Sequence, residues 1–228
     1  MKLIKQPISL SVNNIRLNDS VHHIRHSALL PNTIRCIMCG PSNCGKTNVM
    51  ISLLLHQNGL KFRNLYLYCK TTFQPKYRFL TEVLKRVPQI NFYEFSDDKD
   101  VISPSEALTN SVFIFDDVAC ENQVNIRNYF CMGRHKQIDC FYLSQTYSKI
   151  PKQLLRDNVN FLIIFKQDDV NLKHIYEEHV SSDLQWKEFK NICRTVWSKP
   201  YNFLLINKES SLNNGRYRQN FDIFFKFD

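Results

Sequence analysis

The sequence has few of the residues and segments that mark fibrous, disordered or membrane proteins. Only 5 of its 228 residues are glycine and 8 are proline, which excludes collagen-like and low-complexity architectures. No run of about 18 apolar residues occurs, so no membrane-spanning helix is expected. Lys2, Lys5 and Pro7 interrupt the first apolar residues, so no signal peptide is predicted. These absences predict a soluble, intracellular protein.

The 8 cysteines lack the regular spacing of a disulfide framework. Most lie in or beside apolar runs, where a free thiol behaves as a small hydrophobic side chain, and a reducing compartment is expected. Cys36-x-x-Cys39 has the spacing of half a zinc site, but no second pair follows, so zinc is not predicted. His22, His23 and His26 also lack supporting ligands. They lie in a polar segment, 1–30, which we predict to be a solvated arm or short edge strands.

Positive charge is in excess, with 30 Lys and Arg against 21 Asp and Glu, a net charge of +9 and a pI of about 9.1. Such a surplus favours polyanionic partners such as nucleic acid. The basic residues are dense in 61–90, whereas 94–106 is acidic. A solvated helix face and a polar loop explain the two stretches equally well.

Short apolar runs alternate with helical patterns from Thr33 onward. This alternation predicts an α/β fold with a mostly parallel sheet covered by helices on both faces. The expected strands are Ile34–Cys39, Leu65–Cys69, Ile90–Phe95, Val112–Phe115, Cys140–Leu143 and Phe161–Phe165. The expected helices are Lys46–Leu55, Pro75–Val87 and Val124–Met132, with one or two helical turns in 151–158. Phe79, Leu80, Val83, Leu84 and Val87 are predicted to form the buried face of the second helix.

The C-terminal part predicts a helical and hairpin extension of this fold. Val170–His179 and Asp183–Cys193 have helical patterns, with Trp186 and Phe189 expected to pack on the body of the domain. Tyr201–Ile206 and Phe221–Phe227 are predicted to pair as a hairpin. We therefore divide the chain into the arm 1–30, a core 31–206 and a C-terminal hairpin or tail 207–228.

The strongest motif follows the first predicted strand and precedes a helix. Gly40-Pro41-Ser42-Asn43-Cys44-Gly45-Lys46-Thr47 fits G-x-x-x-x-G-K-[ST], the phosphate-binding P-loop. Its backbone N–H groups and the helix N-terminus bind phosphate oxygens. Lys46 supplies a cation to the β- and γ-phosphates, and Thr47 binds Mg²⁺. We assign residues 40–48, including Asn48, to binding of ATP and Mg²⁺.

Polar side chains follow two further apolar strands. Asp116 and Asp117 end the run Val112–Phe115, the pattern of a Walker B motif. Asp116 is predicted to bind Mg²⁺ and Asp117 to polarise the attacking water. Gln145, after the next strand, is predicted to contact the γ-phosphate and that water. The alternatives are an ordinary polar strand end and a polar loop.

Together these residues resemble the FtsK–HerA superfamily of RecA/ASCE-like P-loop ATPases. The similarity is greatest to its viral branch, the poxvirus-type genome-packaging ATPases, and covers roughly residues 30–206. It rests on Asp116-Asp117, Arg134-His135, Leu143-Ser144-Gln145-Thr146 and the run Ile150–Asn158. Much of the superfamily has Asp-Glu where this chain has Asp116-Asp117.

The resemblance implies a motor that packages double-stranded DNA into a capsid. Such ATPases form rings, here a hexamer or pentamer, act on DNA of any sequence and work with capsid or other packaging proteins. An arginine from the neighbouring subunit reaches the γ-phosphate; Arg134 fits that role first and Arg156 second. Lys70, Lys136 and Lys149 are our candidates for DNA contacts.

Two other classes of protein fit a P-loop, and the first is another P-loop NTPase, either a GTPase or a nucleotide kinase. A GTPase has Asn-Lys-x-Asp on a later strand, and Asn207-Lys208-Glu209 lacks the aspartate; a nucleotide kinase needs an acceptor pocket and a lid, which we do not identify. A non-hydrolysing DNA-binding or scaffold protein is the second alternative. The intact Lys46, Thr47, Asp116 and Asp117 favour hydrolysis instead.

Overall fold

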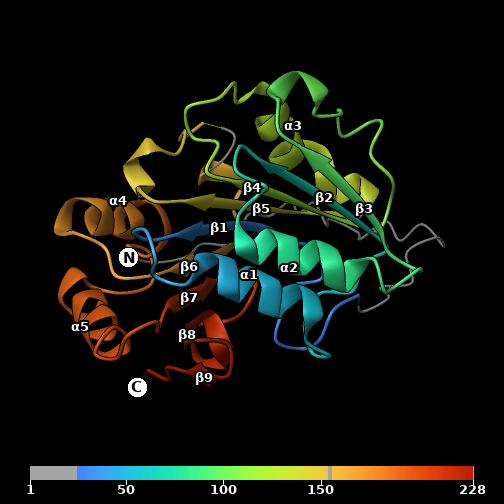
Figure 1. Ribbon diagram of the computed structural model, residues 1–228. Coiled ribbons are helices and arrows are strands. Elements are labelled where there is room, and N and C mark those ends of the chain that lie inside the picture. The colour runs from blue at the N-terminus through green and yellow to red at the C-terminus, as the bar shows by residue number, and fades with distance from the viewer. Residues whose placement is uncertain (1–24, 154–155, 228) are drawn as a thin grey trace, which may run out of the picture.

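A nine-stranded sheet runs through the molecule in the order β3-β2-β4-β5-β1-β6-β7-β8-β9 (Figure 1). The computed structural model describes residues 25–153 and 156–227. The strands from β3 to β6 in that order are parallel, and β7, β8 and β9 join antiparallel. The strands are β1 (Arg35–Cys39), β2 (Asn64–Cys69), β3 (Asn91–Phe95), β4 (Ser111–Asp116), β5 (Ile138–Ser144), β6 (Phe161–Ile164), β7 (Leu204–Asn207), β8 (Tyr217–Gln219) and β9 (Ile223–Phe224).

Helices cover both faces of this sheet and make two cores. One core receives buried side chains from α1 (Lys46–Leu55) and α2 (Pro75–Leu84), which lie side by side in Figure 1. The other receives them from α3 (Val124–Met132), α4 (Asp169–His179) and α5 (Trp186–Val196). The predicted mostly parallel α/β fold is therefore confirmed, as is the packing of Phe189 on the domain. Among the described residues, no helix is long and apolar enough to cross a membrane.

Several 3-10 turns join these elements and lie near the residues of interest. They are η1 (Asp98–Asp100), η2 (Gly133–Lys136), η3 (Tyr147–Lys149) and η4 (Arg156–Asn158). The turn η4 is the part of the helical turns predicted in 151–158 that the structure shows. Residues 212–216 form a wider turn, η5 (Leu212–Arg216), in which Gly215 has a φ of +89°.

The second helix is shorter than predicted, and of its predicted buried face Leu80 and Leu84 are buried whereas Phe79 is not. It ends at Leu84 rather than Val87, and its buried residues are Tyr77, Leu80 and Leu84. Phe79, predicted to be buried, is 53% exposed. Tyr77 takes its place because its ring fits under the sheet while its hydroxyl reaches a carboxylate described below. An amphipathic pattern that treats tyrosine as polar misses this arrangement.

The C-terminal strands pair differently from the predicted hairpin. The strand β7 pairs with β8, and β8 in turn pairs with β9, so 201–206 and 221–227 are not partners. The left-handed Gly215 lets the chain turn back early enough for Tyr217 to pack in the core, where its hydroxyl donates to Asp183 at 2.8 Å. The missed strand is short and contains Arg218 and Gln219, so it has no apolar run to mark it.

The start of the described chain is anchored to the sheet. The Asp139 side chain in β5 lies 2.9 Å from Nε2 of His26 and 3.1 Å from a guanidinium nitrogen of Arg25. It also accepts the backbone N–H of Ile34 at 2.8 Å. His26 is buried, in contrast to the solvated arm that was one of the two alternatives predicted for 1–30. His22 and His23 lie outside the described residues.

The two cysteines with zinc-like spacing face opposite sides of β1. Cys36 packs in the core beneath α1 and α2, and Cys39 packs in the other core. Side chains three positions apart on a strand point to opposite faces. The two thiols therefore cannot share a metal ion.

Candidate nucleotide site

The P-loop connects the central strand β1 to α1 and has the backbone that its glycines permit. Gly45 caps α1 with a φ of +111°, and Asn43 has a φ of +60°. A Cβ atom at Gly40 would lie 2.6 Å from Cβ of Phe165 and 2.7 Å from Sγ of Cys44. Both glycines are therefore required, one for its left-handed conformation and one for lack of space.

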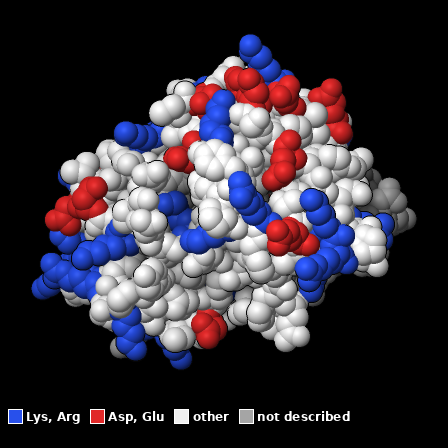
Figure 2. All heavy atoms as spheres, viewed as in Figure 1, with Lys and Arg blue, Asp and Glu red and all other residues white. Residues whose placement is uncertain are grey.

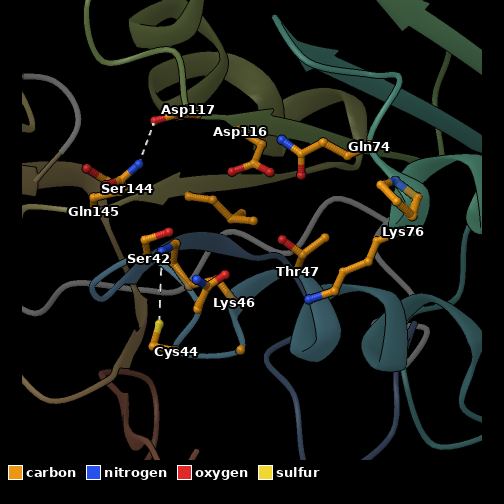
Figure 3. Close-up of a pocket in the computed structure, with 14 residues that line it drawn as sticks. Ser42, Cys44, Lys46, Thr47, Gln74, Lys76, Asp116, Asp117, Ser144 and Gln145 are labelled. Carbon is orange, nitrogen blue, oxygen red and sulfur yellow. Dashed lines mark hydrogen bonds between the residues drawn. The ribbon is translucent and has the colours of Figure 1, made fainter.

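The Lys46 side chain folds back into the P-loop. Its Nζ donates to the carbonyl oxygens of Gly40 at 2.6 Å and Pro41 at 3.0 Å. The ammonium group therefore lies within the loop that the motif assigns to phosphate, as Figure 3 shows. These two bonds orient the charge before any phosphate is bound.

A cavity of about 280 Å³ opens beside this loop. Its walls come from residues 42–47 of the loop, 74–76 at the start of α2, 116–117 at the end of β4, and 143–145 at the end of β5. Parallel strands bring these segments together because their carboxyl ends lie at one edge of the sheet. The predicted Lys46, Thr47, Asp116, Asp117 and Gln145 all line this one cavity.

Asp116 is buried at the end of β4, only 8% exposed, and accepts a hydrogen bond from the hydroxyl of Tyr77. Burial raises the pKa of the Asp116 carboxyl, while the bond from Tyr77 and the charge of Lys46 act in the opposite direction. Figure 3 shows Asp116 and Thr47 on facing sides of the cavity. A carboxylate and a hydroxyl beside a phosphate loop are oxygen ligands that suit Mg²⁺.

Asp117 and Gln145 meet at the mouth of the cavity, from the ends of the neighbouring strands β4 and β5. Nε2 of Gln145 donates to Oδ1 of Asp117 at 3.4 Å, a long bond, and both residues are exposed (Figure 3). Asp117 has a φ of +57°, a conformation that Asp tolerates better than most residues. The turn directs its carboxylate away from the strand and toward Gln145.

Sequence reasoning missed three residues of this site. Gln74 and Lys76 line the cavity from α2, and Tyr77 holds Asp116. In Figure 3 the Gln74 side chain extends toward Asp116, and Lys76 extends toward Thr47. The sheet topology could have indicated these residues, because they follow β2, which is parallel to its neighbour β4 and ends at the same edge of the sheet. Lys76 brings a second positive charge that we did not predict.

Neither predicted arginine lines the cavity of its own chain in the described part of the structure. Arg134 is exposed in η2, before the first residue of β5, whereas Gln145 follows the last. A seven-residue strand separates them by about 20 Å. Arg134 therefore cannot act on the nucleotide of its own chain.

Arg156 is held inside its own chain. It is 8% exposed, and its guanidinium lies 2.7 Å from Oε1 of Glu178 and 5.1 Å from the centre of the Tyr147 ring. To reach another subunit it would have to leave the ion pair and the ring. Arg134, which is exposed, fits a contact between subunits better.

The pairing of Arg156 belongs to a buried polar chain that also contains His179. The Tyr147 hydroxyl lies 2.8 Å from Glu178 and 2.6 Å from Nε2 of His179, and Nζ of Lys208 lies 3.5 Å from Nδ1. A neutral ring with its proton on Nε2 satisfies every contact: it donates to Tyr147 and accepts from Lys208. Burial, with the charges of Lys208 and Arg156, lowers the pKa of His179 to about 3.

Folding is therefore expected to weaken in acid through His179. The unfolded chain takes up this proton below about pH 6.5, whereas the folded chain does so only near pH 3, so this contribution is complete above pH 6.5 and falls as the pH is lowered. At pH 4.5 the loss amounts to about 2–3 kcal/mol. Urea unfolding at pH 7 and pH 4.5 should show it, and His179→Gln should remove that part of the difference. The exposed His135→Gln is the control; an equal pH dependence in all three proteins would contradict the assignment.

The three lysines predicted to contact DNA have different surroundings. Lys70 lies 3.2 Å from Glu121, and Nζ of Lys136 donates to the carbonyl of Ser105. Lys149 is exposed in η3. Figure 2 shows further basic side chains over α2 and the residues that follow it, where Arg78, Lys85 and Arg86 are exposed. Acidic side chains lie over the segment that contains η1.

The run Asn207-Lys208-Glu209 cannot serve as a guanine-binding motif. It ends β7, which is antiparallel to β6, and Asn207 pairs with Phe161, the first residue of β6. The run therefore lies at the sheet edge opposite the P-loop. This position removes the only feature of the sequence that pointed to a GTPase.

Solved structures with this fold come from other P-loop proteins. The genome-packaging NTPase B204 from Sulfolobus turreted icosahedral virus 2, solved with sulfate, is 13% identical, with a TM-score of 0.57 over 87% of this chain and 100% of that one. Its complex with ATP-gammaS is 14% identical, with a TM-score of 0.53 over 79% and 94%. EssC (ATPases 2 and 3) from Geobacillus thermodenitrificans is 13% identical, with a TM-score of 0.50 over 76% and 37%.

Comparisons of sequence are more specific. No curated protein matches the chain. A family model described as the poxvirus A32 protein matches residues 21–224, which include the P-loop, both carboxylates after β4 and Gln145. Because this match extends over most of the sequence, the chain belongs to the poxvirus A32 protein family.

Proposed function

We propose that this protein is an ATP-hydrolysing motor that moves double-stranded DNA into a viral capsid. The observation that carries the proposal is the single cavity that brings together Lys46, Asp116 and Gln145 from three separate elements. Membership of the A32 family and the fold shared with a genome-packaging NTPase support the coupling to DNA.

The charged and polar residues predicted for the cavity each have a defined task in this proposal. Lys46 exchanges its bonds to the loop carbonyls for bonds to the β- and γ-phosphates, so its charge is already in place when ATP enters. Asp116 and Thr47 would hold Mg²⁺, which supplies positive charge to the phosphates. Tyr77 fixes the orientation of the Asp116 carboxylate.

Asp117 and Gln145 orient the water molecule that attacks the γ-phosphate. Their side chains point toward each other at the mouth of the cavity. A water held between a carboxylate and an amide is oriented for in-line attack on the γ-phosphate. The shorter side chain of aspartate, where much of the superfamily has glutamate, is offset by the left-handed turn that brings Asp117 forward.

The partners that we propose are DNA, copies of this chain and the capsid. The net charge of +9 and the exposed basic residues in and just after α2 suit phosphate contacts that are independent of DNA sequence. A ring, hexameric or pentameric, places Arg134 of each subunit within reach of another subunit's nucleotide. Capsid or other packaging proteins would direct the ring to its capsid.

Hydrolysis with and without duplex DNA tests the coupling. We expect duplexes of unrelated sequence to stimulate turnover to a similar extent, and binding to weaken about tenfold for every two phosphate contacts between 50 and 200 mM salt. An ATPase turnover that is the same with and without DNA, or a DNA affinity that is unchanged over this range of salt, would contradict the proposed motor function. Lys149→Ala should reduce the salt dependence if this lysine contacts phosphate, and Lys173→Ala, an exposed lysine on α4, is its control.

A further inference from the structure

Tyr201 is an exposed aromatic residue on an unusual backbone. It lies in the loop between α5 and β7, 73% exposed, with a φ of +64°. Bulky side chains seldom adopt this left-handed conformation, and residues held in it tend to occur at functional sites. The energetic cost of both the exposure and the backbone calls for a role that an ordinary loop residue does not have.

The ring of Tyr201 lies against the P-loop. A Cβ atom at Gly45 would be 3.7 Å from Cδ1 of Tyr201 and 3.6 Å from Cε1 of Phe165. The loop that carries Tyr201 is fixed by Asn220, whose side chain accepts the N–H of Phe203 and bonds to Asn202, each at 3.2 Å. The aromatic ring is therefore held beside the loop and still open to solvent.

The topology indicates which end of a nucleotide would meet this ring. The catalytic side chains follow β4 and β5, on one side of β1, so the γ-phosphate points that way. On the other side of β1 lie β6 and β7, and Tyr201 precedes β7 (Figure 1). The base, at the opposite end of the nucleotide from the γ-phosphate, extends toward β6 and β7.

We propose that Tyr201 stacks on the base of the bound nucleotide and so sets its affinity. This inference rests on the proposed binding of ATP in the P-loop cavity. Stacking on an aromatic side chain suits the flat face of any base, and its removal commonly costs about tenfold or more in affinity. A shallow hollow between α1 and α2, lined by Ile51 and the exposed Phe79, is the competing location for the base.

Binding of ADP and of inorganic tripolyphosphate, each with Mg²⁺, separates the base from the phosphates. Tyr201→Ala should weaken ADP about tenfold and leave tripolyphosphate unchanged, whereas Tyr201→Phe should bind both as wild type does. Tyr201→Asn serves as a second variant, because Asn tolerates a left-handed backbone and the loop keeps its shape without the ring. Phe79→Ala, which removes an exposed ring from the competing hollow, is the matched control.

Wild-type ADP affinity in both Tyr201→Ala and Tyr201→Asn would overturn the inference, and a loss of ADP affinity in Phe79→Ala would then assign the base to the competing hollow. Equal losses of ADP and tripolyphosphate in the Tyr201 variants would also overturn it, since the ring would then only support the loop. Lys46→Ala tests the underlying site separately. It should lose affinity for both ligands, and if it does not, the proposed nucleotide site itself is wrong.

Discussion

Replacing Lys46 with alanine is expected to abolish ATP hydrolysis and to weaken ATP binding. The ammonium group already lies within the P-loop, bonded to the carbonyls of Gly40 and Pro41, and no other cation occupies that position in the described structure. Without it the β- and γ-phosphates lose the charge that offsets their own, most of all in the transition state. Steady-state hydrolysis and direct binding of ATP by calorimetry measure the two effects.

Asp117→Asn is the informative companion, because it should lose turnover and keep binding. The amide has the shape of the carboxylate and leaves Lys46, Thr47 and Asp116 in place, but it no longer attracts the proton of the attacking water. Wild-type hydrolysis by Asp117→Asn would show that another group orients the water. Glu121→Gln, which changes an acid that lies outside the cavity, should hydrolyse ATP normally.

The second large loss of ATP turnover is expected when Arg134 is replaced, because we propose that it acts on the nucleotide site of a neighbouring subunit. Its position at the far end of β5 from Gln145 prevents it from reaching its own nucleotide. An arginine supplied in this way accelerates phosphoryl transfer by about 10³–10⁵. Turnover per chain should therefore rise with protein concentration and with DNA long enough to assemble the ring, and Arg134→Ala should lose this gain.

Mixing two inactive variants gives the sharpest test of the shared site. Arg134→Ala keeps its P-loop and Lys46→Ala keeps its arginine, so some interfaces in a mixture are intact and part of the activity should return. Full activity of a monomer, or wild-type turnover of Arg134→Ala, would contradict the mechanism. If Arg156→Ala fails instead, the residue was misassigned and the shared site remains. If Lys76→Ala abolishes turnover in a monomer, the second cation comes from the same chain.

The fold was largely predictable because its signals are local. The buried strands β1, β2, β4, β5 and β6 consist largely of consecutive apolar residues, and the P-loop motif marks the connection from β1 to α1. The strand β8 could not be predicted in this way. Its burial depends on the hydrogen bond from Tyr217 to Asp183 and on the turn at Gly215. These features involve separate segments of the chain, so no run of apolar residues predicts them.

The site was predictable where a motif carries it and not where topology does. Lys46 belongs to the P-loop motif, Asp116 ends an apolar strand and Gln145 follows one, and all three line the cavity. Their resemblance to the poxvirus-type branch is confirmed by the family match. The role of Tyr77 was not predicted, because its hydroxyl bonds to a residue 39 positions away. The pairing of Arg156 with Glu178 is likewise a contact that spacing does not reveal.

The separation of Arg134 from Gln145 along β5 has a consequence for how copies of the chain combine. If the arginine serves another subunit, the contact joins two different surfaces, head to tail, and the same contact repeats from one copy to the next. A closed circle then has as many complete ATP sites as subunits, whereas an open chain leaves one nucleotide without an arginine and one arginine without a nucleotide. Closing the ring would therefore complete the one ATP site that lacks an arginine in the open chain.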